Sequence, residues 1–220
     1  MIPPSFGTDE ARPEYYGGMV RYAITDRRML GTHERDCSHA VIAQASRLAM
    51  QGVDLIQLRE TDLPEANLEI LASQLGEAMR GFGETAPKLL VNGPARVAIA
   101  SGADGVHLRG GASAGELRAV RLAFKEAGRR PPVLSVSCHS VEEIRKLTLF
   151  GADFILFGPV FEKRVHGMLV TPGLGIASLR EACKLTSLPN ILALGGITEQ
   201  NASLCVESGA VGIAGIRMFL

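Results

Sequence analysis

His139 stands between a stretch of alternating Ser and apolar residues, 135–138, and a Ser-Val-Glu-Glu segment that begins at Ser140. A Ser followed three residues later by a Glu is typical of a capped helix start, so His139 is predicted to lie where a buried strand ends. A neutral imidazole in that position can accept and return a proton near pH 7. We therefore expect His139 to be a catalytic acid/base, and Ser137 to bind a substrate or to hold the imidazole ring. A structural histidine is the alternative.

Four further polar residues are predicted to lie at or near the ends of three other strands. Gln57 and Arg59 are two residues apart and should share one face of their strand. A charge at the end of a buried strand is costly without a partner, so Arg59 is either an anion ligand or half of an ion pair with Glu60. Asn92 ends the next strand, and His107 lies near the end of the one after it. For His107, a hydrogen-bonded position in the interior is the alternative to a ligand contact.

Two glycine-rich segments near the C-terminus are typical of an anion site. Gly195-Gly196 follows one predicted strand, and Gly215-Ile216-Arg217 ends the last one. Glycines in such places let backbone amides approach a phosphate closely, and Arg217 could add a charge-assisted hydrogen bond. Two tight turns and a solvated Arg217 are the alternative. We expect Gly195, Gly196, Ile216 and Arg217 to bind phosphate.

A long segment without a helical pattern, residues 158–173, follows another predicted strand. Long structureless loops are uncommon in compact domains and are often active-site lids. Gly158 at its start predicts backbone that lines a ligand, and Lys163, Arg164 and His166 could reach an anionic substrate. A solvated loop is the alternative for each of these three side chains.

The elements that must position these residues are marked by a phrase that recurs four times: a Gly, a small residue and usually an Asp before an apolar run. The copies begin at Gly52, Gly102, Gly151 and Gly209, at spacings of 50, 49 and 58 residues. Each spacing is about twice one strand-plus-helix unit, so the phrase marks every second strand. The Gly should end a helix in a left-handed conformation. Four marked and four unmarked strands predict an α/β fold, the (β/α)8 TIM barrel, with its chemistry at the carboxyl ends of the strands.

Hydrophobic periodicity predicts a single barrel domain, 19–220, after an N-terminal extension, 1–18. Strands are predicted over 19–25, 54–59, 88–92, 105–108, 133–137, 153–157, 190–194 and 211–216. Helices are predicted over 37–51, 64–80, 95–101, 114–127, from 140 onward, 176–186 and 199–208. Few residues follow the last strand, so the eighth helix should be short or missing. We expect the N-terminal extension or a second subunit to cover the apolar face that this leaves, and hence a homo-oligomer.

The composition excludes several functional classes. Of 220 residues, 46% are hydrophobic, and 23 basic residues balance 23 acidic ones without a basic block. We expect no nucleic-acid partner, because neutralising phosphates needs clustered Lys and Arg. No apolar run reaches the roughly 20 residues of a membrane span and the N-terminus has no apolar signal core, so we expect a cytoplasmic protein. The four cysteines form no Cys-x-x-Cys pair, which predicts reduced thiols and leaves only the role of Cys138, beside His139, open.

Taken in order, the motifs at the predicted strand ends resemble the thiamine phosphate synthase/TenI family. The motifs are QLRE, VNG, ADGVHL, SVSCHSVEE, ADFILFGPVF, ALGGI and GAVGIAGI, and the similarity runs from about Met19 to Phe219. Each motif alone is weak, whereas the ordered set is specific. The resemblance implies a β/α barrel of the thiamin pathway with a phosphorylated thiazole as its ligand.

The resemblance also implies two branches with different chemistry. The synthase branch joins a pyrimidine pyrophosphate to the thiazole phosphate with Mg²⁺. Its pattern has a Lys after the Arg-Glu, an Asp after the Asn and a Gly-Gln-x-Asp stretch after the His-Leu; here these places hold Thr61, Gly93 and Arg109-Gly110-Gly111-Ala112. Gly93 and Ala112 carry no side-chain oxygen, the ligand that Mg²⁺ needs. A Lys of the segment 158–173 is replaced as well, by His166.

The second branch, the TenI thiazole tautomerases, needs no metal and is similar in Asn-Gly, in the stretch around His139 and in Phe-Gly-x-Val-Phe-Glu. We therefore expect a metal-independent isomerase without a cofactor, in which His139 shifts the proton that aromatises a thiazole carboxylate phosphate. Two alternatives stay open: a thiamine phosphate synthase with displaced Mg²⁺ ligands, and a non-catalytic barrel that binds a thiazole or thiamin phosphate. An unrelated phosphate-binding barrel isomerase is disfavoured by the ordered motifs.

Overall fold

The computed structural model describes residues 18–31, 37–147, 151–165, 168–185 and 190–220, and within them the chain forms a closed barrel of eight parallel strands. The barrel strands are β1 (Val20–Ile24), β2 (Leu55–Leu58), β3 (Lys88–Val91), β4 (Gly105–Leu108), β5 (Val133–Cys138), β6 (Phe154–Phe157), β9 (Asn190–Leu194) and β10 (Gly212–Gly215). They follow one another around the barrel in chain order, and β10 closes it against β1. The predicted TIM barrel is therefore confirmed.

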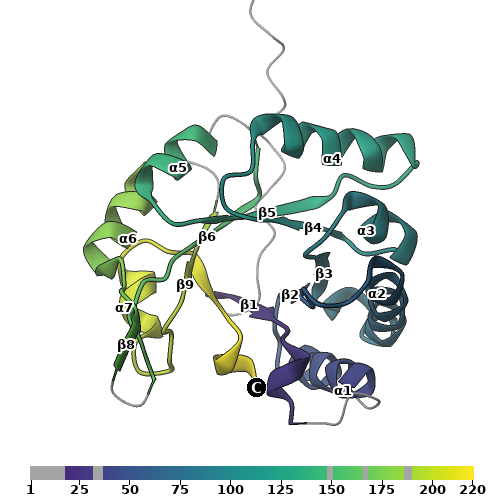
Figure 1. Cartoon of the computed structure of the whole chain (residues 1–220), viewed down its shortest axis with the longest axis horizontal. Coiled ribbons are helices and arrows are strands. Elements are labelled where there is room, and N and C mark those ends of the chain that lie inside the picture. Colours follow the sequence, from purple (N-terminus) through teal and green to yellow (C-terminus); the bar gives the residue numbers. More distant parts are fainter. Residues whose placement is uncertain (1–17, 32–36, 148–150, 166–167, 186–189) are drawn as a thin grey trace, which may run out of the picture.

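Helices alternate with the barrel strands and surround them (Figure 1). They are α1 (Cys37–Met50), α2 (Glu65–Arg80), α3 (Ala95–Ser101), α4 (Ala114–Glu126), α5 (Val141–Leu147), α6 (Gly175–Lys184) and α7 (Ala202–Glu207), with 3-10 turns η1 (Arg27–Met29), η3 (Gly83–Thr85) and η4 (Arg217–Phe219). The largest boundary error is at α7, which begins three residues later than predicted, because Asn201 accepts a hydrogen bond from the Thr198 amide in a turn before the helix. No helix in the described ranges is long and apolar enough to cross a membrane.

Gly52, Gly102 and Gly209 of the repeated phrase end helices as predicted, whereas residues 148–150, before Gly151, lie outside the described ranges. The φ angles are +71° at Gly52, +78° at Gly102, +78° at Gly151 and +103° at Gly209. This left-handed conformation is accessible to Gly without the steric cost that a Cβ atom adds. The next strand therefore begins three residues after each of these glycines.

The aspartates of the phrase join neighbouring strands. The carboxylates of Asp54, Asp104 and Asp153 accept hydrogen bonds from backbone amides of β1, β3 and β5, at 2.7, 2.9 and 2.7 Å. Each Asp thus ties the strand it precedes to the strand before it, with a charge-assisted bond. The fourth copy has Val211 in this place, so β10 is positioned without such a carboxylate.

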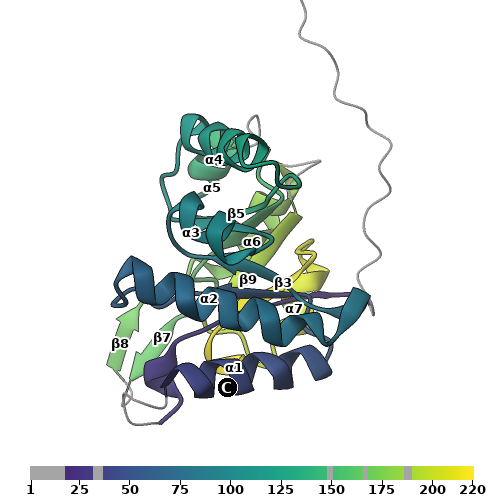
Figure 2. The same cartoon turned by 90° about the vertical axis from the view of Figure 1, so that its right-hand side faces the viewer.

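The segment 158–173 contains structure that the sequence did not predict. Two short strands, β7 (Lys163–Val165) and β8 (Met168–Thr171), pair in antiparallel fashion outside the barrel. The hairpin lies at the same end of the barrel as η1, which follows β1 (Figure 2). Its base is fixed because the amides of Leu174 and Gly175 donate to the carbonyls of Pro159 and Val160, at 2.8 and 2.9 Å. The prediction of a loop without regular structure was therefore wrong.

The last strand is covered from within the chain. The eighth helix is replaced by η4, which lies beside α1, and Phe219 of η4 is buried in the same cluster as Ala23 and Ile213 on the outer face of the barrel. The Gln44 side chain of α1 donates to the Phe219 carbonyl at 3.0 Å. Ile213 on this face is fully buried, and cover of the face by the N-terminal extension or by a second subunit stays a prediction. The N-terminal extension lies outside the described residues apart from Gly18, and the homo-oligomer stays a prediction.

Candidate functional site

Polar side chains gather inside the barrel along one half of its wall, from β1 to β5. Tyr22, Gln57, His107 and Ser135 are buried, and Arg59, Asn92 and Ser137 are half-buried. The inward-facing side chains that the structure describes on β6, β9 and β10 are apolar instead, with Phe154, Leu156, Leu192 and Ala214 in one buried cluster. We call the first group the polar half. The second half is followed by glycine-rich loops, 158–161 and 195–196, and we call it the glycine half.

His107 is the centre of a hydrogen-bonded chain in the polar half. Its Nδ1 lies 2.8 Å from the Ser135 hydroxyl and its Nε2 lies 3.0 Å from the Ser137 hydroxyl. The Tyr22 hydroxyl lies 2.8 Å from the same Ser135 oxygen. Burial, and after it the positive charge of Arg59, lower the pKa of His107 to about 4. His107 is therefore neutral near pH 7. It is hydrogen-bonded in the interior, and its contact with a ligand stays a prediction.

Gln57 carries a buried acceptor without a partner. Its amide nitrogen donates to Asn92 Oδ1 at 3.2 Å, but its Oε1 has no hydrogen-bond partner although the residue is buried. A buried amide oxygen without a donor costs about 1–3 kcal/mol, so such an atom is expected to meet a donor in the functional state. The pair Gln57–Asn92 therefore offers a hydrogen-bond acceptor near the carboxyl ends of β2 and β3.

Arg59 is not the partner of Glu60. The Glu60 carboxylate is buried and accepts from the Thr25 hydroxyl at 2.6 Å and from Arg27 Nη1 at 3.1 Å, and the Arg27 guanidinium also binds Asp62. Thr25 in turn accepts from the Arg59 amide at 3.0 Å. Successive side chains of a strand point to opposite sides. Arg59 therefore points into the barrel, whereas Glu60 points toward η1.

The Arg59 guanidinium is therefore left available. It makes no hydrogen bond or ion pair with a residue in the described ranges, and its charge acts on His107 and on Asp26. Of the two predictions for Arg59, the ion pair with Glu60 is wrong. The anion ligand stays a prediction.

His139 lies at the rim between the two halves. Its Nδ1 donates to the Gly158 carbonyl at 2.6 Å, which fixes the neutral ring with its lone pair on Nε2. The ring lies against Gly110, where an added Cβ would come within 3.1 Å of its Cδ2 atom. The predicted capping interaction is present in part, since Ser140 accepts from the Glu143 amide while Glu143 accepts from the His139 amide. Ser137 holds the ring of His107 and not that of His139.

The glycine half is built on close approach of backbones. The chain after β6 pairs with the chain after β9: Val160 donates to the Leu194 carbonyl at 2.7 Å and Phe161 to the Gly195 carbonyl at 3.0 Å. A Cβ on Gly158 would lie 2.1 Å from the Leu194 oxygen. On Gly195 and Gly196, both with positive φ, a Cβ would lie 2.6 and 2.7 Å from Pro159 and Phe161 side-chain atoms. Packing alone therefore requires these glycines, and their role in phosphate binding stays a prediction.

The remaining candidates lie near the rim. The amides of Gly196 and Arg217 donate no hydrogen bond to the residues that the structure describes, although the ends of β9 and β10 are adjacent. Ile216 packs against the inner apolar cluster, and Arg217 and Lys163 are exposed. His166 and the side chain of Arg164 lie outside the described residues. The thiol of Cys138 is buried and its pKa is raised to about 12 by burial and by Glu143, so it is not a nucleophile at neutral pH.

Three residues of this site were not predicted: Tyr22, Thr25 and Ser135. Tyr22 and Ser135 each lie within a predicted strand, so the alternation of side chains could have placed Tyr22 and Ser135 in the interior. Ser135 also shares its face of the strand with Ser137. No sequence signal pairs them, because they are 113 residues apart and meet only across the closed barrel.

The side chains that the structure describes do not form a site suited to a bound Mg²⁺. Among the residues that the structure describes, no three His, Cys, Asp or Glu side chains are grouped so as to hold a metal ion. Gly93 and Ala112 offer no side-chain oxygen. The nearby carboxylates are engaged: Glu60 by Arg27 and Thr25, and Glu116 and Glu143 by backbone amides. The described residues therefore do not fit a Mg²⁺ ion held by carboxylates of the protein.

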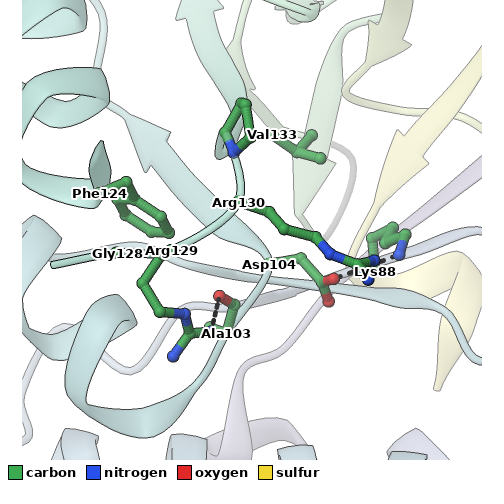
Figure 3. A pocket seen from close by; sticks show the side chains of 9 residues that line it. Lys88, Ala103, Asp104, Phe124, Gly128, Arg129, Arg130 and Val133 are labelled. Atoms are coloured by element: carbon green, nitrogen blue, oxygen red, sulfur yellow. Dashed lines mark hydrogen bonds and ion pairs between the residues drawn. The ribbon is translucent and has the colours of Figure 1, made fainter.

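A cavity of about 380 Å³ lies at the opposite end of the barrel, where β3, β4 and β5 begin (Figure 3). Lys88 in its wall pairs with Asp104 at 3.3 Å, and Arg129 donates to the carbonyl of Ile99 at 3.0 Å. Both cationic side chains therefore already have partners within the protein. The cavity is therefore separate from the polar half and does not contribute to the candidate site.

Comparisons with known proteins agree with the motifs. A family model described as thiamine monophosphate synthase matches residues 22–219. The chain is 36% identical over 196 residues to a protein of Geobacter sulfurreducens named "Putative thiamine-phosphate synthase", covering 88% of this chain and 83% of that protein. It is 35% identical over 198 residues to the thiamine-phosphate synthase of Methanoregula boonei, covering 88% and 82%.

A solved structure, a thiamine phosphate pyrophosphorylase from Pyrococcus furiosus, has a TM-score of 0.70 at 24% identity and covers 90% of this chain and 86% of that chain. This likeness supports the fold. The names of the sequence relatives overturn the expectation of an isomerase: they are synthases, so the prediction of a thiazole tautomerase was wrong. The missing carboxylates and Lys favoured the tautomerase branch and left the synthase as an alternative, but the relatives named as synthases match this chain over nearly its whole length.

Proposed function

The chain belongs to the thiamine monophosphate synthase family, and on that premise we propose that it is a thiamine-phosphate synthase, a transferase that joins a pyrimidine pyrophosphate to a thiazole phosphate. The observation that carries the proposal is the 35% identity to a thiamine-phosphate synthase over 88% of this chain. An enzyme of the thiamin pathway is thus proposed in place of the isomerase.

Joining these two substrates forms a bond between the carbon that carries the pyrophosphate and the thiazole nitrogen, and it releases pyrophosphate. The protein must therefore hold two phosphorylated molecules side by side, stabilise the charge of the leaving group and exclude water. The two halves of the barrel divide this work in our proposal. The polar half holds the pyrimidine and its leaving group, and the glycine half holds the thiazole phosphate.

Several contacts support the polar half as the pyrimidine site. The buried Gln57 Oε1 has no donor, which an amino group of an aminopyrimidine would supply. Ser137 and Asn92 offer further polar contacts at the same end of the barrel. Arg59 has no partner in the described part of the chain, and its guanidinium would bind the leaving pyrophosphate in a bidentate manner. His139 Nε2, fixed as the lone-pair nitrogen, would accept a hydrogen bond at the boundary between the substrates.

The glycine half supports a phosphate site of backbone type. The amides of Gly196 and Arg217 are unpaired within the described residues and follow two adjacent strands. Backbone amides that have no protein acceptor are suited to phosphate oxygens, and the Arg217 and Lys163 side chains would add positive charge. The phosphate of the thiazole substrate is proposed to bind here.

The resemblance to the synthase branch implies Mg²⁺, and the residues that the structure describes do not fit it. In our proposal the positive charge opposite the pyrophosphate therefore comes from the protein, first from Arg59, and no step of the reaction is assigned to a metal ion. Arg109, which stands in the stretch where the synthase pattern has carboxylate and amide residues, is exposed at the end of β4 and adds a second positive charge at this rim.

The proposal is tested by incubating the purified protein with both substrates and measuring thiamine phosphate and released pyrophosphate, in one series with Mg²⁺ and in another with a chelator. We expect equimolar formation of both products. Binding of each substrate alone is measured in parallel by calorimetry. If both substrates bind and no thiamine phosphate forms under either condition, the protein is a non-catalytic binder and the proposed synthase activity is rejected.

A further inference from the structure

A chain of four hydrogen-bonded groups crosses the barrel from β1 to β5 and β4. It runs from Tyr22 to Ser135, His107 and Ser137, with separations of 2.8, 2.8 and 3.0 Å. β1 and β5 stand opposite each other in the closed barrel, so the first contact spans its interior. Tyr22 and Ser135 are fully buried, and Ser137 is the first member that reaches solvent.

The number of hydrogens in this chain fixes its direction. The Tyr22 hydroxyl stays protonated, since burial raises its pKa, and its hydrogen has only the Ser135 oxygen as an acceptor within the described residues. Ser135 receives that bond, and its own hydrogen has only His107 Nδ1 as an acceptor within the described residues, so it is donated there. A neutral His107 then carries its proton on Nε2 and donates to Ser137. The reverse direction would leave the Tyr22 hydrogen buried without an acceptor, which costs about 1–3 kcal/mol.

We propose that Tyr22 is a positioning residue for the substrate site: it sets the direction of the chain through Ser135 and His107, so that the Ser137 hydroxyl accepts from His107 and turns its own hydrogen toward the ligand. Ser137 is thereby a hydrogen-bond donor. It donates that hydrogen to a ligand atom with a lone pair, such as an aromatic ring nitrogen or a phosphate oxygen. The identity of the ligand rests on the proposed function, whereas the direction of the chain does not.

The chain direction is tested in the ligand-free protein by ¹⁵N NMR of histidine-labelled samples, which distinguishes protonated from unprotonated ring nitrogens. At pH 7 we expect the proton of His107 on Nε2. His139 serves as an internal reference with the opposite tautomer, because its Nδ1 donates to a carbonyl. In Tyr22→Phe the constraint is removed, so a fraction of His107 should move its proton to Nδ1 while the His139 signals stay unchanged. A His107 proton on Nδ1 in the unmodified protein, or an unchanged His107 tautomer in Tyr22→Phe, overturns the proposal.

The consequence for binding is tested by titrating the pyrimidine pyrophosphate and the thiazole phosphate separately. Tyr22→Phe should weaken one of them about 5-fold, the equivalent of one hydrogen bond, with little change in the melting temperature. In the Ser137→Ala background, Tyr22→Phe should have no further effect, because Tyr22 acts through Ser137. If the losses of affinity caused by Tyr22→Phe and Ser137→Ala add up in the double variant, Tyr22 does not act through Ser137. If neither compound binds, the proposed function fails, and the NMR result still decides the direction of the chain.

Discussion

The two halves of the barrel hold their functional groups in different ways. In the polar half, side chains from β1 to β5 bind one another through hydroxyl, amide and imidazole groups, and the backbone follows regular strands. In the glycine half, the loops after β6 and β9 lie so close that only glycine fits at Gly158, Gly195 and Gly196. One half thus depends on hydrogen-bond partners and the other on the absence of side chains.

This difference predicts different responses to mutation. Removing one of the half-buried side chains of the polar half, such as Asn92 or Ser137, leaves its partner where water can replace the lost bond at a modest cost. Adding a side chain to the glycine half forces two backbones apart, and packed interiors have little room to yield. The predictions below test this contrast, beginning with the largest effect.

Among substitutions that add one methyl group in the candidate site, Gly158→Ala should lower the free energy of unfolding most. A Cβ at this position would lie 2.1 Å from the Leu194 carbonyl oxygen, so β6 and β9 must separate. We expect a loss of about 3 to 5 kcal/mol in the free energy of unfolding, measured by denaturant titration. The matched control is Gly76→Ala in α2, where the nearest atom would be at an ordinary 3.7 Å. It should be neutral or slightly stabilising, and equal losses in both variants would contradict the close-approach explanation.

The second effect concerns the polar half and depends on pH. Burial and Arg59 lower the pKa of His107 to about 4, against an ordinary value of 6.5. Between pH 6.5 and 4, His107 is protonated in the unfolded chain but not in the folded chain. The free energy of unfolding should therefore fall as the pH drops from 6.5 toward 4. The shift corresponds to about 3 kcal/mol, fully present above pH 6.5 and lost over this window.

This contribution is measured by comparing the pH dependence of unfolding free energy in the unmodified protein and in His107→Gln. The variant should be less stable at pH 7, because the hydrogen bonds to Ser135 and Ser137 change, but its stability should fall less steeply between pH 6.5 and 4. Parallel curves for the two proteins would show that His107 does not titrate as its burial requires.

Sequence reasoning succeeded where a residue's role depends on its own strand. The glycines that end helices, the alternation that places Gln57 and Arg59 inward and the order of eight barrel strands all follow from local spacing. It failed where the partner is distant in sequence. Glu60 pairs with Arg27 because η1 returns to β2, and Tyr22 meets Ser135 only in the closed barrel. The hairpin of β7 and β8 was missed because each strand is very short and lies outside the buried sheet, so neither shows alternation.

The smallest of these effects should appear in binding and not in stability. Arg59→Ala removes a guanidinium that has no hydrogen bond or ion pair in the described part of the chain, so its melting temperature should change little. Pyrophosphate affinity should fall about 10- to 100-fold, the equivalent of 1.5 to 3 kcal/mol for a charge-assisted contact, as measured by calorimetry with inorganic pyrophosphate. Arg59→Lys should recover only part of it, because an ammonium group cannot bind in a bidentate manner. Arg96→Ala is the matched control, since Arg96 binds Glu65 on the outer helices and should leave pyrophosphate affinity unchanged. If Arg59→Ala binds pyrophosphate as well as Arg96→Ala does, the free charge of Arg59 does not serve the anion, and the polar half holds its ligand through hydrogen bonds alone.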